Sequence, residues 1–323
     1  MTWRRPPRWW PVALGGACVV VVALVLATSW SPVVAGHPAY LMTLLVVAAG
    51  GVVAVTLATV TVRSDAPDRS TSPSRARRWG RWIGRGLATV TVVGILAALW
   101  WLRPLGATDV ALHALASGDG VEVVQSATRV ELRPTGHLDP TGVVFYPGAK
   151  VDARAYAAIL RPLAEAGHLV VIVKLPFGIA FTDVNAATSV IEAEDGVVRW
   201  AVAGHSLGGT VAARYVAGHH DRVAGLVLWA SYPAGSLAPH GDLTVLSVSG
   251  TNDGLTTPAD VLASKPDLPR DTTFVAVRGA VHADFGDYGT QKGDGTPTIP
   301  REDAQRQITA ATLAFLTELD QTR

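Results

Sequence analysis

Three long apolar runs occupy the first hundred residues of the chain, at residues 11–30, 39–62 and 83–102. The first two contain no charged side chain, and the third contains only Arg85. Each run is about twenty residues long or slightly more, which is enough to cross the hydrocarbon core of a bilayer. Tryptophans near the ends of the runs fit the aromatic belts of a membrane interface. We therefore expect three transmembrane helices over these ranges.

A cleaved signal peptide is the alternative interpretation of the first run. Such a peptide has a shorter apolar region, and a cleavage site follows it. Residues 31–38 instead form a brief uncharged link to the second run. A signal peptide also leaves the second and third runs unexplained, so we favour retained helices.

Beyond residue 103 the pattern changes to short apolar strands separated by helical segments. Residues 121–132 alternate in polarity, as one or two edge strands would. The expected buried strands lie at residues 142–146, 169–173, 198–203, 223–229, 243–248 and 272–277, and the expected helices at 152–166, 207–219, 258–264 and 301–319, with a weak helix ending near residue 194. This alternation predicts an α/β fold with a mostly parallel, doubly wound sheet. We expect a membrane region at residues 1–103 and a soluble domain at residues 104–323.

The distribution of arginine predicts how the chain crosses the membrane. Arginines occur in residues 1–10, and loop 63–82 carries six of them against two aspartates, whereas link 31–38 has none. The positive-inside rule places the N-terminus and loop 63–82 in the cytoplasm, and hence the soluble domain outside it. A basic loop that binds nucleic acid is the alternative. The net charge of only +1 gives no global field for such a partner, and we expect none.

A Gly-His-Ser-Leu-Gly sequence at residues 204–208 lies between an expected strand and an expected helix. This is the nucleophile-elbow pattern, in which glycines let strand and helix approach closely while a strained turn exposes the serine. The amide of Leu207 lies at the helix N-terminus, where it can stabilise an oxyanion. An ordinary glycine-rich turn has the same sequence, so the context must decide. We expect His205 to pack or to form hydrogen bonds locally rather than react.

A nucleophilic serine needs a base, and the base needs an orienting carboxylate. Two downstream loops leave strands at the same rim of the sheet: residues 249–254 carry Asp253, and residues 278–285 carry His282. The order Ser206, Asp253, His282 is that of α/β-hydrolases. Taken alone, Asp253 could be an Asx-turn residue and His282 a surface histidine. Two further acids, Asp284 and Asp287, follow His282 closely and compete with Asp253.

Four motifs give residues 140–320 a family resemblance. They are Tyr146-Pro147-Gly148, residues 204–209, the Gly-Thr-Asn-Asp-Gly loop 250–254 and the His-Ala-Asp-Phe-Gly-Asp-Tyr-Gly loop 282–289. The domain resembles an α/β-hydrolase, particularly a small bacterial group. The resemblance implies Ser206 as nucleophile, His282 as general base and then acid, and Asp253 as orienting acid. It also implies an oxyanion hole from the amides of Leu207 and Ala149, although Pro147-Gly148 departs from the His-Gly or Gly-Gly-Gly that many members have there.

These observations predict a membrane-anchored serine hydrolase that cleaves a small-molecule carboxylic ester through an acyl-serine intermediate. A thioester, lactone or peptide bond remains open, because the same triad cleaves them all. A non-catalytic, membrane-tethered binding module is the second hypothesis. The hypothesis of a transporter has little support, because the expected spans carry no buried charge that would mark a pathway. Only residues 230–242 join two central strands, so we expect no lid and an open pocket that prefers short acyl groups.

No motif in the sequence implies a cofactor or a metal. The chain has no Walker loop, no dinucleotide-binding glycine fingerprint and no His-Glu-x-x-His sequence. Cys18 is the only cysteine, so the sequence excludes a disulfide within the chain and a cysteine metal site.

Overall fold

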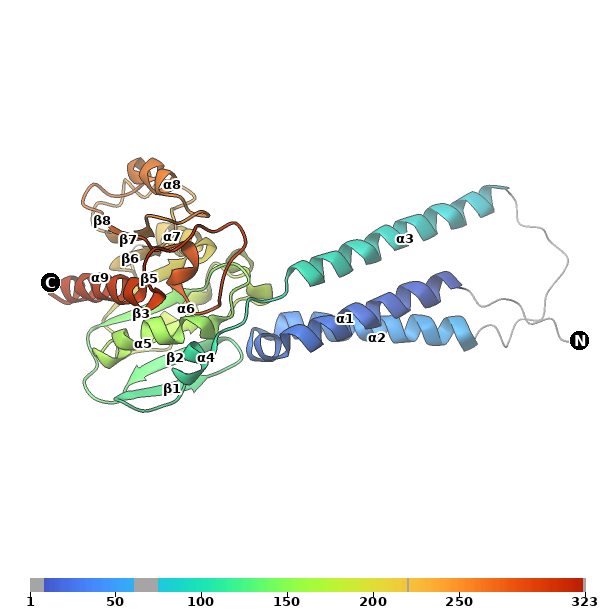
Figure 1. Ribbon diagram of the computed structural model, residues 1–323, viewed down its shortest axis with the longest axis horizontal. Helices are drawn as coiled ribbons and strands as arrows, with labels where there is room; N and C mark the ends of the chain where they lie inside the picture. The colour runs from blue at the N-terminus through green and yellow to red at the C-terminus, as the bar shows by residue number, and fades with distance from the viewer. Residues whose placement is uncertain (1–8, 61–74, 220, 322–323) are drawn as a thin grey trace, which may run out of the picture. The chain divides into compact units, whose positions relative to one another are not determined.

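The computed structural model describes residues 9–60, 75–219 and 221–321, which divide into two compact units. One unit runs as far as Arg103 and leaves out residues 34–38, and the other contains those residues together with Pro104–Arg323. The first unit holds the long apolar helices and the second holds the sheet (Figure 1). We describe each unit separately.

Three helices of membrane-spanning length and composition form the first unit, as the sequence predicts. They are α1 (Trp9–Ala35), α2 (Pro38–Val60) and α3 (Arg75–Trp101). Helix α1 continues past its expected end through a kink at Ser29, where φ is −141°. Pro32 explains the kink, because its ring clashes with the carbonyl one turn earlier and it has no amide to donate. Helix α3 begins before its apolar run, because the arginine-rich segment from Arg75 to Trp82 is helical as well. Residues 1–8 and 61–74, which hold most of the expected cytoplasmic arginines, lie outside the described residues.

Glycines let α1 and α2 approach closely. A Cβ atom on Gly15 would lie 2.5 Å from the carbonyl oxygen of Gly51, and one on Gly51 would lie 2.6 Å from that of Gly15. Such small-residue contacts are typical of helix pairs in membranes, where close packing replaces the hydrophobic effect. The Tyr40 hydroxyl donates to the carbonyl of Leu99 at 2.6 Å and so joins α2 to α3.

The second unit is built on an eight-stranded sheet in the order β1-β2-β4-β3-β5-β6-β7-β8. The strands are β1 (Val121–Gln125), β2 (Arg129–Pro134), β3 (Thr141–Tyr146), β4 (Val170–Val173), β5 (Arg199–His205), β6 (Gly225–Trp229), β7 (Thr244–Gly250) and β8 (Thr273–Val277). Strands β1 and β2 form the antiparallel edge, and all pairs from β4 to β8 are parallel. The expected α/β class with a mostly parallel sheet is confirmed.

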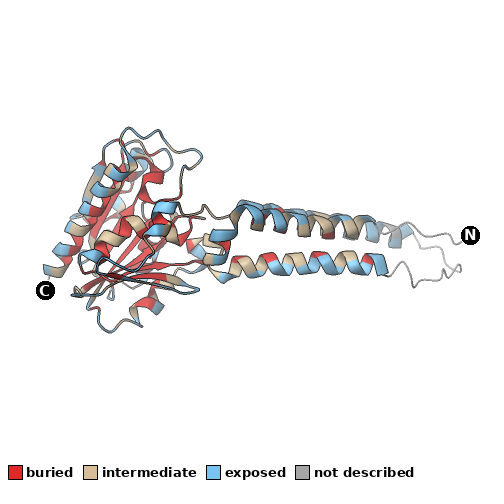
Figure 2. Ribbon diagram, turned by 60° about the horizontal axis from the view of Figure 1, so that its bottom comes forward, coloured by how far each residue is buried: buried red, intermediate tan, exposed pale blue. Residues whose placement is uncertain are grey.

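Helices cover both faces of this sheet, which explains why its central strands read as continuous apolar runs. Helices α5 (Ala157–Glu165) and α9 (Arg301–Gln321) contribute to one core, and α6 (Ala186–Ile191) and α7 (Leu207–Gly218) to the other. Alternate residues of β3 point to the two cores, with Phe145 in the first and Tyr146 in the second. Figure 2 shows this buried layer along the strands. Short helices α4 (Asp109–His113) and α8 (Pro258–Ala263) complete the unit.

Candidate active site

The turn between β5 and α7 holds Ser206 in an unusual backbone conformation. Its φ is 53° and its ψ is −126°, outside the regions that side chains favour, which costs of order 1–3 kcal/mol. The flanking glycines make the turn possible. A Cβ atom on Gly204 would clash with the backbone of Gly208, and one on Gly208 would clash with the carbonyl oxygens of Tyr146 and Pro147. The close approach of strand and helix at this turn therefore requires glycine at positions 204 and 208.

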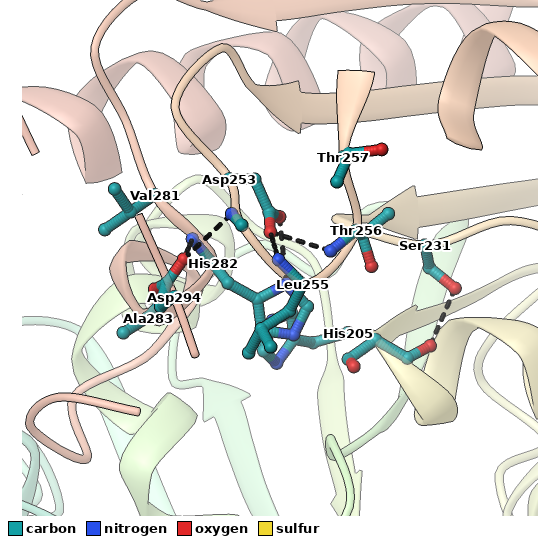
Figure 3. A network of polar contacts seen from close by, with 12 residues as sticks. His205, Ser231, Asp253, Leu255, Thr256, Thr257, Val281, His282, Ala283 and Asp294 are labelled. Atoms are coloured by element: carbon teal, nitrogen blue, oxygen red, sulfur yellow. Dashed lines mark hydrogen bonds and ion pairs between the residues drawn. The ribbon is translucent and has the colours of Figure 1, made fainter. Parts of the chain in front are cut away.

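Hydrogen bonds fix the backbone of the elbow. The Ser206 amide donates to the carbonyl of Trp229 at 2.9 Å. Its carbonyl accepts from the Gly209 amide at 3.0 Å and from the Ser231 hydroxyl at 2.7 Å (Figure 3). The Ser206 side chain is half-buried, and its hydroxyl forms no hydrogen bond with any residue that the structure describes. Catalytic hydrogen bonds are often absent or long until substrate is bound.

Asp253 and His282 are brought together from two loops that are 29 residues apart. The Asp253 Oδ2 atom lies 2.9 Å from His282 Nδ1, and both side chains are buried (Figure 3). The other carboxylate oxygen of Asp253 accepts the amides of Leu255 at 2.8 Å and Thr256 at 2.7 Å. An ionised carboxylate can only accept, so Nδ1 donates and Nε2 keeps the lone pair that a general base needs.

The competing acids Asp284 and Asp287 have other partners. Asp284 accepts the amide of Val281 at 2.9 Å and lies 3.7 Å from the Arg301 guanidinium. Asp287 accepts from the Gln305 side chain at 3.1 Å. Burial raises the pKa of both carboxyl groups above their usual range. Neither is hydrogen-bonded to the His282 ring within the described part of the chain, so the geometry favours Asp253 as its partner.

The His205 ring lies between the elbow and the ring of His282. Its centroid lies 4.5 Å from that of His282 (Figure 3), and its Nδ1 atom lies 2.8 Å from the Tyr156 hydroxyl. That hydroxyl also accepts the Gly148 amide at 2.9 Å. Burial raises the pKa of Tyr156 well above its usual range and lowers the pKa of His205 well below 6.5. The tyrosine therefore stays protonated and donates to a neutral histidine. His205 packs and hydrogen-bonds, as we expected.

Two backbone amides beside the elbow have no acceptor among the described residues. One belongs to Leu207, the first residue of α7, and the other to Ala149 in the turn after β3. Tyr146 pairs with Gly204 in the sheet, so the β3 turn lies beside the elbow. Within that turn the Gly148 amide is already bound to the Tyr156 hydroxyl, whereas the Ala149 amide has no acceptor among the described residues. Two unpaired amides that point to one place can hold an oxyanion, which is the role that the resemblance implies for Leu207 and Ala149.

Asp294 is a site residue that the sequence analysis missed. One carboxylate oxygen accepts the amides of Gly254 and His282 at 3.2 and 3.1 Å, and the other accepts the Ala283 amide at 2.8 Å (Figure 3). The residue therefore links the loop of Asp253 to the loop of His282. In the sequence it stands in a Gly-Asp-Gly turn that gives no sign of this role.

Comparisons with known proteins agree with the family resemblance of the domain. The model of the alpha/beta hydrolase family matches residues 142–306. No curated protein matches the chain. Similar solved structures include a monoacylglycerol lipase from Paleococcus ferrophilus (17% identity, TM-score 0.45, 60% of this chain and 99% of that one) and Est1E from Butyrivibrio proteoclasticus (15%, 0.45, 62% and 98%). An esterase from Pyrobaculum calidifontis is similar too (18% identity, TM-score 0.46, 64% of this chain and 89% of that one).

Proposed function

Because the chain belongs to the alpha/beta hydrolase family, we propose that it is a membrane-anchored serine hydrolase that cleaves carboxylic esters. One observation carries this proposal. The Asp253–His282 pair is buried at 2.9 Å, and the His282 ring lies 4.5 Å from that of His205, the residue next to Ser206. A serine in a strained elbow, a histidine with a free Nε2 and an orienting carboxylate together form the machinery of acyl transfer.

The proposed reaction has two halves. The Ser206 hydroxyl attacks the ester carbonyl while His282 Nε2 takes its proton, and Asp253 stabilises the imidazolium that forms. The amides of Leu207 and Ala149 bind the oxyanion of the tetrahedral intermediate. Collapse of this intermediate expels the alkoxide, which takes the proton from His282. A water molecule then attacks the acyl-serine with His282 again as base, and collapse of the second tetrahedral intermediate releases the acid while His282 returns the proton to the Ser206 oxygen.

We propose short acyl chains as substrates, because the chain between β6 and β7 builds no lid. Residues 230–243 connect Trp229 to Thr244 without a helix or strand. An apolar acyl tunnel needs more lining residues than this connection supplies. Turnover of p-nitrophenyl esters by the full chain in detergent should therefore fall steadily from the two-carbon to the twelve-carbon acyl group. A rising series would contradict the proposal.

Covalent labelling tests the hydrolase assignment directly. A fluorophosphonate probe should modify the full chain in detergent, with the adduct located on Ser206 by mass spectrometry. Ser206→Ala should abolish labelling, and His282→Ala should slow it by about 10⁴-fold or more because nucleophile and base act as a unit. Ser231→Ala is the matched control, since it removes a nearby hydroxyl that contacts the Ser206 carbonyl and the Thr210 hydroxyl but not the Ser206 side chain. An unlabelled but folded wild-type chain would favour a non-catalytic binding module.

A further inference from the structure

Three titratable side chains meet at the rim of the sheet where strands β3 and β4 begin, away from the candidate active site. They are Asp139, just before β3, His168, just before β4, and Asp320 in the last turn of α9. One ligand atom from each lies within 4.8 Å of the others. Because β3 and β4 are parallel, their starts lie at the opposite rim from the Ser206 turn at the end of β5.

The orientation of His168 leaves one ring nitrogen facing this cluster. The side chain is only 3% exposed, and its Nδ1 atom lies 2.9 Å from the carbonyl oxygen of Thr141. A carbonyl only accepts, so Nδ1 carries a proton and Nε2 of the neutral ring has a lone pair. That Nε2 lies 3.8 Å from Asp139 Oδ2 and forms no hydrogen bond with a described residue. Metal-bound histidines are held by this kind of hydrogen bond from the other ring nitrogen.

The two carboxylates supply oxygen ligands and need a positive partner. The Oδ1 atom of Asp139 lies 3.2 Å from His137 Nε2. This contact leaves the Oδ2 atom on the side of His168. Asp320 Oδ1 is buried without a hydrogen-bond partner among the described residues. Asp320 also lies at the C-terminal end of a 21-residue helix, where the macrodipole disfavours a negative charge. Asp320 forms no ion pair within 4.0 Å with a residue that the structure describes.

We propose that Asp139, His168 and Asp320 bind a divalent cation of the zinc class. One imidazole nitrogen and two carboxylate oxygens are a mixed donor set that suits Zn²⁺, whereas Ca²⁺ and Mg²⁺ prefer oxygen alone. The ion is structural, because the site lies at the opposite rim from Ser206. It joins the end of α9 to the starts of β3 and β4. The proposal does not depend on the proposed hydrolase activity.

Zinc binding by the full chain tests the proposal. The protein is purified in detergent with a tag that lacks histidine, stripped with EDTA and titrated with ZnCl₂ by calorimetry. We expect about one Zn²⁺ per chain and a higher melting temperature with Zn²⁺ than with equal Ca²⁺. A wild-type chain that binds no Zn²⁺ would overturn the site and leave a simple His168–Asp139 ion pair.

Variants locate the ion. His168→Asn keeps a donor for the Thr141 carbonyl but removes Nε2, and Asp320→Asn removes one charge. Each substitution should lower the affinity for Zn²⁺ by more than the roughly 10–100-fold loss that follows removal of an outer partner such as His137. Without zinc, Asp320→Asn should melt no lower than wild type, because it relieves repulsion at the helix end.

Two controls complete the test. Glu318→Gln removes an exposed charge from the same end of α9 and should leave the Zn²⁺ affinity unchanged. Fluorophosphonate labelling of zinc-free His168→Asn should equal that of wild type, which separates this site from the serine. Unchanged Zn²⁺ affinity in both ligand variants, or an equal loss in Glu318→Gln, would refute the assignment.

Discussion

The partner of the catalytic-type histidine is decided by which carboxylate reaches its Nδ1 atom. Asp253 does so at 2.9 Å, and the nearby Asp284 instead accepts a backbone amide. Asp253→Asn should lower kcat by about 10⁴-fold, because the amide favours the wrong histidine tautomer. Asp284→Asn should change kcat by less than about tenfold. Ester hydrolysis by both variants checks this, and the reverse ranking would exchange the two roles.

A buried neutral histidine makes stability depend on pH. The pKa of His205 is well below 6.5 in the folded chain because of burial, whereas in the unfolded chain it is ordinary. As the pH falls below about 6.5, only the unfolded state gains this proton, so stability is lost by up to about 1.4 kcal/mol per pH unit.

His205→Asn should therefore reduce the fall in melting temperature between pH 7.5 and 5.5. The substitution keeps an acceptor for the Tyr156 hydroxyl near the place of Nδ1 and removes the titrating ring. His113→Asn, at an exposed position, should leave the fall unchanged. An equal fall in wild type and His205→Asn would mean that this ring is protonated in the folded protein.

Residues that belong to a recognisable motif could be predicted from the sequence. Residues that hold others in place through hydrogen bonds formed only in the folded chain could not. Ser206 could be predicted because a strand and a helix can approach as closely as they do at this turn only if the neighbouring residues are glycine. Tyr156 and Asp294 were missed because a tyrosine in a helical segment and an aspartate between two glycines have common local explanations. Their partners lie at a distance along the chain: Tyr156 and His205 are 49 positions apart. Only the folded sheet brings such pairs together.

At the scale of elements, one carboxylate links two loops by hydrogen bonds and so fixes their relative position. Asp294 accepts amides from the loop of Asp253 and from the loop of His282. Asp294→Asn replaces one acceptor oxygen with a donor that faces an amide. We expect a loss of about 1.5–3 kcal/mol in stability and a fall in kcat of about 10–100-fold, because a small misplacement of the base is costly.

Fluorophosphonate labelling rates and melting curves check both effects. Asp119→Asn is the matched control, since Asp119 also lies between two glycines but in an exposed turn far along the chain. It should leave labelling and melting unchanged. If Asp294→Asn lowered the melting temperature and left the labelling rate at the wild-type value, Asp294 would be a purely structural residue.

Strands and amphipathic helices of the domain could be predicted well, because a sheet covered on both faces imposes continuous apolar runs. The bounds of the long helices were less predictable. The hydropathy pattern places the end of α1 at residue 30 and the start of α3 at residue 83, where the apolar runs end and begin. The backbone hydrogen bonds of the helices extend further, so that α1 continues past Pro32 to Ala35 and α3 begins at Arg75. Helix formation needs no apolar side chain, so the helices exceed the runs that revealed them.

At the scale of the whole molecule, three spans place the two ends of the chain on opposite sides of the membrane in the topology that we propose. Alkaline phosphatase fused after Arg323 should be active in a bacterial host, and a fluorescent protein that folds only in the cytoplasm should stay dark there. Fusions within residues 61–74, between α2 and α3, should give the opposite pair of signals. Identical signals at both positions would mean that α3 does not cross.

The near contact of Gly15 with Gly51 has a consequence for how the protein is made. Only Gly36 and His37 separate α1 from α2, so the two helices can enter the bilayer as one hairpin soon after synthesis. A hairpin returns the chain to the side from which it started. In the proposed topology helix α3 must then insert by itself, and the mean hydropathy of its 18-residue apolar window is 1.7 against 2.4 for each of the other two helices. In this proposed topology the ribosome has yet to finish the hydrolase domain at that moment, so insertion of the least apolar helix would decide into which compartment the domain is delivered.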